Sequence, residues 1–345
     1  MKVTTWLHGT LFVCAAAVAN ALTAQESARG NVATPWHDVS PHVARMVQVA
    51  PGLVLEVLDW GGIGAPLVFL AGGGHTAHVY DGFAPRFTSR FRVVGITRRG
   101  VGASAKPLTG YDSASLAADI VAVLDSLGLS QATFVAHSFG GSELNTLATR
   151  HPARVERLVY LDAAFDYRYL LDSREWTSGR VATPQPPEPA YNDSTAWSWT
   201  LYGERVSGPN FPEAETRSMF VFDTADRFVR MARADSLMGW YLRGVAPVDL
   251  RRVRAPTLAI YAQLVSAEAM FPYWATLDSA ARARGRTSFN AVTALQSRLR
   301  ARFRKAVPHA RVVFIPGARH YVFLTHPGEV EHAMLEFLLL PASGG

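Results

Sequence analysis

Cysteine is almost absent from this chain of 345 residues, since the only one is Cys14. It lies in an N-terminal segment that we expect to be removed from the mature protein. A mature chain without a thiol forms no disulfide, has no thiol nucleophile and offers no cysteine-based metal site. Its length still allows a large core, so we expect the fold to be stable outside the cell without disulfides.

The apolar run near the N-terminus is short. Residues 11–19 are too few to cross a bilayer, and Lys2 precedes them. Small residues follow, with cleavage expected after Ala21 or Ala24. This pattern is typical of a secretion signal, so we predict that residues 1–24 form a signal peptide. The mature protein is then expected in the periplasm or outside the cell, without stable insertion in a membrane.

Charged residues are few, at 18% against 49% hydrophobic, which is the composition of a globular protein. Acidic residues are the scarcer sign, with 28 Asp and Glu against 34 Lys and Arg. The basic excess gathers late in the chain, at Arg282, Arg284, Arg286, Arg298, Arg300, Arg302, Arg304 and Lys305. A nucleic-acid surface would interleave such charges with aromatic residues, and Phe303 is the only one in the last group. We interpret the cluster as a solvated helix face and expect no nucleic-acid partner.

Short apolar segments recur along the chain and predict an α/β fold. The predicted strands are residues 43–49, 53–60, 66–70, 92–96, 132–136, 155–161, 257–262 and 312–315. Residues 115–127 have apolar residues at helical spacing and end at Gly128. Continuous apolar strands separated by helices favour a mostly parallel central sheet with helices on both faces. Sites in such sheets form beyond the carboxyl ends of the strands.

The alternation of strands and helices fails between residues 165 and 250. This stretch is rich in tryptophan and tyrosine and carries a proline cluster at residues 183–189. We predict that it is a helical lid of residues 165–250, inserted into a core of residues 43–164 and 251–340 within one domain. Its aromatic side chains could line a pocket for an apolar substrate, or they could belong to ordinary packing of a small subdomain.

The most informative motif joins an apolar strand to a helix through a serine. Residues 132–136 lead to Ser138, and helix-like sequence starts at Gly140. At such a turn the serine hydroxyl is exposed at the edge of the sheet, and the next backbone N–H, that of Phe139, is aimed at the same point. The crowded turn favours small neighbours such as Ala136. The alternative interpretation is that Ser138 only caps a helix.

Four motifs in this order resemble those of the α/β-hydrolase superfamily, in its lidded, single-domain form. Along the chain they are an oxyanion loop at residues 70–75, an arginine-glycine turn at residues 98–104, a nucleophile elbow at residues 136–140, and a catalytic-histidine loop at residues 317–320 followed by Pro327. The resemblance covers nearly all of residues 43–340. Two positions depart from the pattern: Ala71 stands where the superfamily commonly has histidine, and Ala136 where glycine is more usual.

The resemblance implies acyl transfer to water through a serine nucleophile. Ser138 would attack, and His320 would take the hydroxyl proton and return it to the leaving group. The backbone N–H groups of Gly73 and Phe139 would form the oxyanion hole. A serine rather than an aspartate at the elbow weighs against dehalogenase and epoxide-hydrolase chemistry. We expect hydrolysis of a small-molecule carboxylic ester, with no cofactor.

The acid that orients His320 is less clearly marked. In some relatives it follows the strand after the nucleophile helix, where Asp162 stands, and in others it follows the strand before the last, where Glu268 is the nearest carboxylate. We prefer Asp162, with Glu268 as the alternative acid and Asp166 as a third candidate. Amide, peptide or carbon–carbon bond hydrolysis, perhydrolysis and ligand binding without catalysis stay open.

Other residues near these motifs are expected to shape the substrate pocket, namely Gly74, His75, Tyr80 and His137. His75 and His78 stand three residues apart and could bind a metal only together with further ligands. The sequence identifies none, so we assign no metal site.

Overall fold

A computed structural model describes residues 36–179, 181–190 and 194–340. The predicted signal peptide of residues 1–24 lies outside the described residues. The main sheet has eight strands in the order β1-β2-β4-β3-β5-β6-β9-β10. Their bounds are β1 Val43–Ala50, β2 Leu53–Gly61, β3 Pro66–Leu70, β4 Arg92–Ile96, β5 Ala132–His137, β6 Val155–Leu161, β9 Thr257–Gln263 and β10 Arg311–Pro316. β2 pairs antiparallel with β1 and β4, and the pairs from β4 to β10 are parallel.

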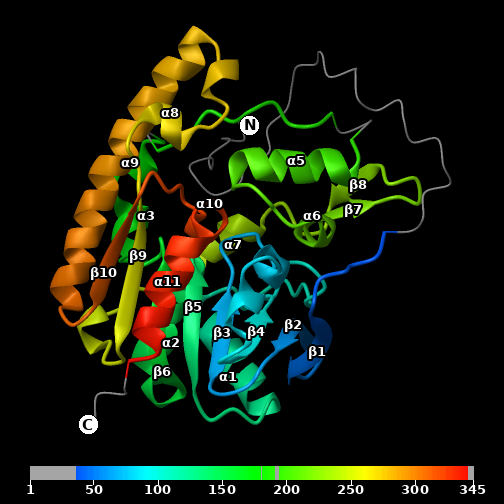
Figure 1. Cartoon of the computed structure of the whole chain (residues 1–345), viewed down its shortest axis with the longest axis vertical. Coiled ribbons are helices and arrows are strands. Elements are labelled where there is room, and N and C mark those ends of the chain that lie inside the picture. Colours follow the sequence, from blue (N-terminus) through cyan, green and yellow to red (C-terminus); the bar gives the residue numbers. More distant parts are fainter. Residues whose placement is uncertain (1–35, 180, 191–193, 341–345) are drawn as a thin grey trace.

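The central strands are mostly apolar because both of their faces are covered (Figure 1). In β3, Val68 and Leu70 belong to one buried cluster, while Leu67 and Phe69 belong to the cluster on the opposite face. α1 (Ser113–Ser126), α2 (Gly140–Arg150) and α9 (Ser279–Ala306) contribute to the first cluster, and α11 (Pro327–Leu338) to the second. The predicted mostly parallel sheet with helices on both faces is therefore confirmed.

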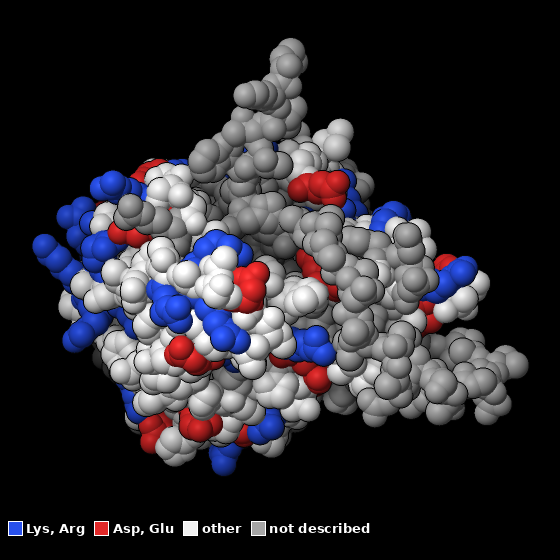
Figure 2. Space-filling model, turned by 90° about the horizontal axis from the view of Figure 1, so that it is seen from above, with Lys and Arg blue, Asp and Glu red and all other residues white. Residues whose placement is uncertain are grey.

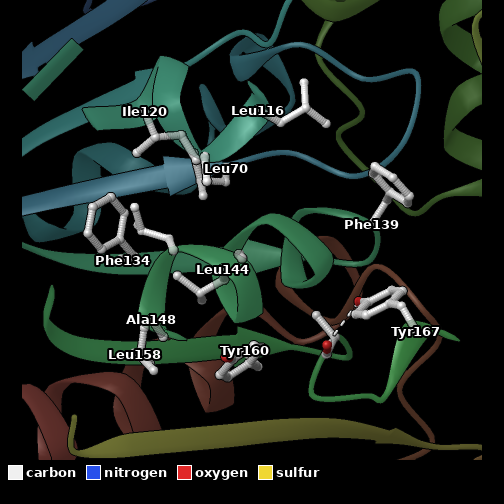
Figure 3. Close-up of a cluster of buried hydrophobic side chains, with 14 of the residues drawn as sticks. Leu70, Leu116, Ile120, Phe134, Phe139, Leu144, Ala148, Leu158, Tyr160 and Tyr167 are labelled. Carbon is white, nitrogen blue, oxygen red and sulfur yellow. Dashed lines mark hydrogen bonds between the residues drawn. The ribbon is translucent and has the colours of Figure 1, made fainter. Parts of the chain in front are cut away.

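Figure 3 shows part of the first cluster, between the sheet and α2. Phe134 of β5 and Leu158 of β6 lie near Leu144 and Ala148 of α2. All four side chains are buried. Burial of apolar area at about 25 cal/mol per Å² makes contacts of this kind the main stabilising term of the core. The turn that carries Ser138 thus lies between two elements that pack closely against each other.

The segment between β6 and β9 interrupts the α/β pattern, at the place where the sequence predicts a lid. It contains α3 Tyr167–Asp172, α4 Arg174–Thr177, α5 Ala196–Val206, α6 Glu213–Met219, β7 Phe220–Phe222, β8 Phe228–Met231 and α7 Leu237–Gly244. β7 and β8 form a small antiparallel sheet that the sequence pattern did not predict. In Figure 1, α5, α6 and this sheet lie above the carboxyl ends of the central strands.

Short helices fill most of the remaining connections. They are η1 Ala77–Tyr80, η2 Ala84–Phe87, η3 Pro152–Arg154, η4 Leu250–Arg252, α8 Ala267–Met270, η5 Trp274–Thr276 and α10 Val322–Thr325. Within the described parts of the chain, no helix combines the length and the apolar character that crossing a membrane requires.

The basic cluster predicted on a helix face lies on α9, which runs for 28 residues. Arg284, Arg302 and Arg304 are exposed there. Figure 2 shows basic side chains gathered at the left edge of the molecule, the side on which Figure 1 shows α9. Arg300 departs from the expected solvated face, because its guanidinium carbon lies 4.9 Å from the centre of the Tyr261 ring and 5.4 Å from that of Phe314.

Candidate active site

Ser138 stands at the turn between β5, which ends at His137, and α2, which begins at Gly140. Its φ is +50°, in the left-handed region that residues with a side chain rarely adopt. A backbone of this kind persists only where its surroundings hold it in place, and it is often found at functional positions. A Cβ at Gly140 would come within 2.9 Å of the carbonyl oxygens of Leu70 and Ala71. Glycine is therefore required two residues after the serine.

Three side chains from three separate strand ends meet here. His320 Nε2 lies 2.8 Å from Ser138 Oγ, and His320 Nδ1 lies 2.8 Å from Asp162 Oδ2. Asp162 directly follows β6, is fully buried and also has a positive φ, of +46°. Since Asp162 Oδ2 can only accept, Nδ1 carries the proton and Nε2 is free to accept the proton of the serine hydroxyl.

The other two candidate acids lie elsewhere. Glu268 is exposed on α8, and both ring nitrogens of His320 are already paired with Ser138 and Asp162. Asp166 caps α3 and accepts a hydrogen bond from Arg302 at 2.9 Å. The structure therefore brings only Asp162, of the three, to the ring of His320.

Asp162 has further partners that hold its second oxygen. Oδ1 accepts a hydrogen bond from the backbone N–H of Ala262 at 3.3 Å. Nη2 of Arg300 lies 3.9 Å from the same oxygen and donates to the carbonyl oxygen of Ala262 at 2.6 Å. This buried carboxylate is thus fixed in orientation and faces a positive charge. Sequence reasoning missed Arg300, because its position within an arginine-rich helix gave no sign of an inward direction.

The predicted oxyanion loop passes directly beside the serine turn. A Cβ built on Gly72 would lie 3.3 Å from Ser138 Cβ, and one on Gly73 would lie 3.5 Å from Phe139 Cβ. Gly73 and Phe139, the two predicted donors, are therefore neighbours in space. The same Cβ on Gly73 would come within 2.9 Å of Met238 Cε, so glycine also leaves room for α7 of the lid.

Arg98 fixes the orientation of this loop through hydrogen bonds to its backbone. Its guanidinium donates to the carbonyl oxygens of Ala71 and Gly72, both at 2.5 Å, and to the carboxylate of Glu143 at 2.6 Å and 3.1 Å. In a trans peptide the C=O of one residue and the N–H of the next point in opposite directions. The bond to the Gly72 carbonyl therefore turns the Gly73 N–H away from Arg98. Sequence reasoning missed Glu143, which stands in the first turn of α2 and pairs with Arg98.

The predicted pocket role of Gly74, His75, Tyr80 and His137 is wrong, because none of them lines the cavity at Ser138. Tyr80 is buried in the core and donates its hydroxyl to the Leu70 carbonyl oxygen at 3.0 Å. His75 is buried between Glu215 and Tyr321, at 2.8 Å and 2.7 Å. His75 and Tyr80 therefore support the oxyanion loop from the side away from the cavity. Their nearness to the loop in sequence had led us to expect them in the cavity lining.

His137 lies behind the catalytic-histidine loop rather than in the pocket. Its Nε2 donates to the carbonyl oxygen of His320 at 3.1 Å, and the two rings lie 4.6 Å apart. Burial, reinforced by the neighbouring His320, holds the pKa of the His137 imidazole well below its usual range. A neutral ring at this position adds no charge next to His320.

A mostly apolar cavity of about 220 Å³ opens at Ser138, His320 and Phe139. Much of its lining comes from the predicted lid, including Leu171, Trp176, Tyr202, Phe211, Met219 and Phe220. Further lining comes from the end of β9, from α9, from Met270, Phe271 and Tyr273, and from the residues on either side of His320. A mostly apolar cavity lined by a few polar groups is the usual form of a small-molecule site.

Comparison with known proteins agrees with this geometry. Residues 67–333 match the model of the alpha/beta hydrolase family. The chain belongs to this family. This α/β hydrolase is 27% identical to 2-(acetamidomethylene)succinate hydrolase of Mesorhizobium japonicum over 306 residues. The match covers 86% of this chain and 95% of the relative. A crystal structure of E-2-(acetamidomethylene)succinate hydrolase superimposes with a TM-score of 0.63 at 23% identity, covering 86% of this chain and 99% of that one.

A second relative matches more strongly over a shorter region. This α/β hydrolase is 38% identical to a putative non-heme haloperoxidase of Mycobacterium phage D29 over 104 residues. That match covers 30% of this chain and 37% of the phage protein. The similarity is therefore to part of the fold. The two relatives are named for different activities.

Proposed function

We propose that this protein is a serine hydrolase that cleaves carboxylic esters of small, apolar substrates through an acyl-enzyme on Ser138. The observation that carries the proposal is the relay from Asp162 through His320 to Ser138, with both hydrogen bonds at 2.8 Å, in the lining of a mostly apolar cavity. Each group has the position that its role requires before substrate binds, which is what efficient catalysis demands.

The reaction follows from these positions. Ser138 Oγ attacks the ester carbonyl carbon while His320 Nε2 takes its proton, and Asp162 stabilises the imidazolium that results. The oxyanion accepts hydrogen bonds from the N–H groups of Gly73 and Phe139, each worth roughly 3 kcal/mol of barrier. His320 returns the proton to the leaving alcohol. Water, activated by the same histidine, then releases the acid.

The size of the cavity sets the expected substrate range. At about 220 Å³, it is smaller than the roughly 300–1,000 Å³ typical of sites for drug-sized ligands. Short acyl chains should therefore react faster than long ones. We expect kcat/KM to fall along a p-nitrophenyl ester series once the acyl chain exceeds the cavity.

Two measurements test the proposal. Wild-type protein should hydrolyse p-nitrophenyl acetate or butyrate, and Ser138→Ala should lose about 10⁴–10⁶-fold in kcat. A fluorophosphonate probe should label one serine per chain, identified as Ser138 by peptide mapping. Undiminished turnover by Ser138→Ala would refute the mechanism. Absence of both labelling and turnover in folded wild-type protein would favour a ligand-binding protein without catalysis.

Amide hydrolysis is the second candidate, because the relative that aligns along most of this chain is named for an acetamido compound. The same three residues would serve, with His320 protonating an amine instead of an alcohol. Carbon–carbon bond and peptide hydrolysis would use the same groups. Matched ester and amide substrates with the same acyl group separate these possibilities by their kcat/KM values.

Export is part of the proposal as well, on the strength of residues 1–24 alone. Expression of the full chain in a bacterial host, followed by N-terminal sequencing of the periplasmic fraction, tests it. Cleavage after Ala21 or Ala24 is expected. An uncleaved chain in the cytoplasm would contradict it.

A further inference from the structure

Four metal-ligating side chains form a cluster outside the serine site. Asp38, His42, His78 and Asp81 each present a ligand atom within 4.8 Å of the others. Asp38 and His42 precede β1, whereas His78 belongs to η1 and Asp81 follows it. Folding thus joins two segments that lie far apart in the sequence. We propose that these four residues bind one divalent transition-metal cation, with Zn²⁺ as the best fit.

The distances between the ligand atoms fit a tetrahedral ion. Asp38 Oδ2 lies 3.5 Å from His42 Nε2 and 3.7 Å from His78 Nδ1, and His78 Nδ1 lies 3.1 Å from Asp81 Oδ2. Ligands bound to Zn²⁺ at about 2.0–2.1 Å stand about 3.3–3.4 Å from one another in a tetrahedron. These three separations lie within about 0.4 Å of the tetrahedral value, and all four ligand atoms lie within 4.8 Å of one another.

Each imidazole has one nitrogen toward the cluster and the other toward a carboxylate. With His42 Nε2 as ligand, its Nδ1–H donates to Asp81 Oδ1 at 2.9 Å. With His78 Nδ1 as ligand, its Nε2 faces Glu56 Oε1 at 3.6 Å. Histidine ligands of metals almost always direct their second nitrogen at a carboxylate or carbonyl, which fixes the ring and raises its basicity.

The surrounding side chains hold the carboxylates as well. The indole N–H of Trp60 donates to Asp81 Oδ1 at 3.0 Å, which leaves Oδ2 for the ion. Thr97 donates its hydroxyl to Glu56 Oε2 at 2.8 Å. A site with oriented outer partners differs from a chance group of surface acids, whose side chains are solvated and free to rotate.

Burial and charge also favour a cation. The side chains of His42, His78 and Asp81 are 6%, 9% and 5% exposed, and that of Asp38 is 25% exposed, which leaves one open path. Asp38, Asp81 and Glu56 bring three carboxylates to a poorly solvated region, and a divalent cation compensates two of their charges. The mixed nitrogen and oxygen ligands select zinc-like ions, since Mg²⁺ and Ca²⁺ prefer oxygen alone.

The bound ion would act as a cross-link. It would connect the segment before β1 to η1, which begins two residues after His75 and four after the predicted donor Gly73. A mature chain without cysteine has no disulfide to fix this junction. The expected role is therefore structural, stabilising the support of the oxyanion loop without contact with substrate.

The test is stoichiometric metal binding by the whole protein. Chelator-treated wild type, exposed to micromolar ZnCl₂ and desalted, should retain one zinc per chain by mass spectrometry, and zinc should raise its Tm. Co²⁺ should give the intense visible absorption of a tetrahedral site, and X-ray absorption of the zinc form should show two imidazole ligands. These measurements on wild type need no variant to fold.

Variants then locate the site. His42→Gln and Asp38→Asn should lose stoichiometric zinc, and Trp60→Phe should weaken zinc affinity by about 10–100-fold. His332→Gln is the matched control, because this exposed histidine pairs with Glu336 one helical turn away and could bind zinc adventitiously. Circular dichroism reports whether each variant is folded.

Two results would overturn the proposal. One is wild-type protein that retains no zinc and shows no change in Tm with any of Zn²⁺, Co²⁺ or Ni²⁺. The other is zinc lost in His332→Gln but kept in Asp38→Asn. Either would leave the cluster as a buried network of hydrogen bonds and ion pairs. Because esterase activity is not the readout, failure of the proposed hydrolase function would be seen separately.

Discussion

Glu215 of the lid and His75 of the oxyanion loop are joined by a hydrogen bond of 2.8 Å, and both side chains are almost completely buried. The other ring nitrogen of His75 lies 2.7 Å from the hydroxyl of Tyr321, the residue after His320. Glu215 also accepts from the backbone N–H of Thr76 at 3.0 Å, as well as from its hydroxyl. Glu215 thus ties the lid directly to the oxyanion loop and, through His75, to the loop that carries His320.

We predict that Glu215→Gln destabilises the protein by about 1–3 kcal/mol, because the amide nitrogen cannot replace an acceptor oxygen in this buried network. Urea unfolding measures the change in the free energy of unfolding. Glu329→Gln, at an exposed position on α11, should change it by less than about 0.5 kcal/mol. Equal stability of the two variants would show that the lid is held by its apolar contacts alone.

Arg98 is expected to act on catalysis through Gly73. Arg98→Lys keeps the charge but replaces the planar fork of three nitrogens that donate to Ala71, Gly72 and Glu143 with a single ammonium group, so the Gly73 N–H loses its fixed direction. We predict a fall of about 10²-fold in kcat, as for loss of an oxyanion donor, with little change in KM.

Arg99→Lys is the matched control for Arg98→Lys. Arg99 is the next residue and pairs with Asp119 at 2.5 Å and 2.7 Å, away from the oxyanion loop. The kcat of Arg99→Lys for p-nitrophenyl acetate should stay within a few-fold of that of the wild type. A similar loss in both variants would mean that any disturbance of this turn, rather than the orientation of Gly73, lowers the rate.

Two of the three carboxylates considered for the relay, Asp162 and Glu268, make opposite predictions. Asp162→Asn should lower kcat by about 10⁴-fold, because His320 would adopt the wrong tautomer and its imidazolium would lose a charge partner. Glu268→Gln should leave kcat unchanged, since Glu268 is exposed on α8. Steady-state kinetics of both purified variants decide, and a large effect at Glu268 would reverse the assignment.

Buried His137 should make stability fall in acid. Its pKa is lowered in the folded protein, chiefly by burial, so below about pH 6.5 the unfolded chain binds a proton that the folded one does not. The stabilising effect of the neutral ring is present above that pH and is lost as pH falls, by up to about 1.4 kcal/mol per pH unit.

His137→Gln should reduce that slope while leaving a donor for the His320 carbonyl oxygen. Urea unfolding at several pH values between about 5 and 7 measures the slope of the free energy of unfolding against pH. His37→Gln, at an exposed position, controls for loss of a histidine as such. An unchanged slope in His137→Gln would show that the folded protein protonates this ring after all.

Much of the architecture could be predicted because its signals are local. The strands read as continuous apolar runs since both faces of the sheet are covered, as Leu67 and Val68 illustrate by packing on opposite sides. The small residues around Ser138 follow from the crowded turn. Asp162 could be named because it stands directly after a predicted strand.

The parts that could not be predicted depend on contacts between distant segments. Nothing local in the sequence of α6 says that Glu215 meets His75, which is 140 residues away. His78 alone gave no sign of Asp38 and His42. The pocket was misassigned for the same reason: residues next to the oxyanion loop in sequence were expected in front of it, whereas the lid supplies that surface.

The insertion between β6 and β9 has an evolutionary consequence. Ser138 and His320 lie outside the predicted lid of residues 165–250, and Asp162 precedes it, so the three residues of the relay and most of the cavity wall are encoded in separate stretches of the gene. Mutation or exchange of this one contiguous stretch could redirect the enzyme to new substrates while the catalytic apparatus is inherited intact. The sequence of a replacement segment would be little constrained, since it would need to supply a buried acidic residue to pair with His75.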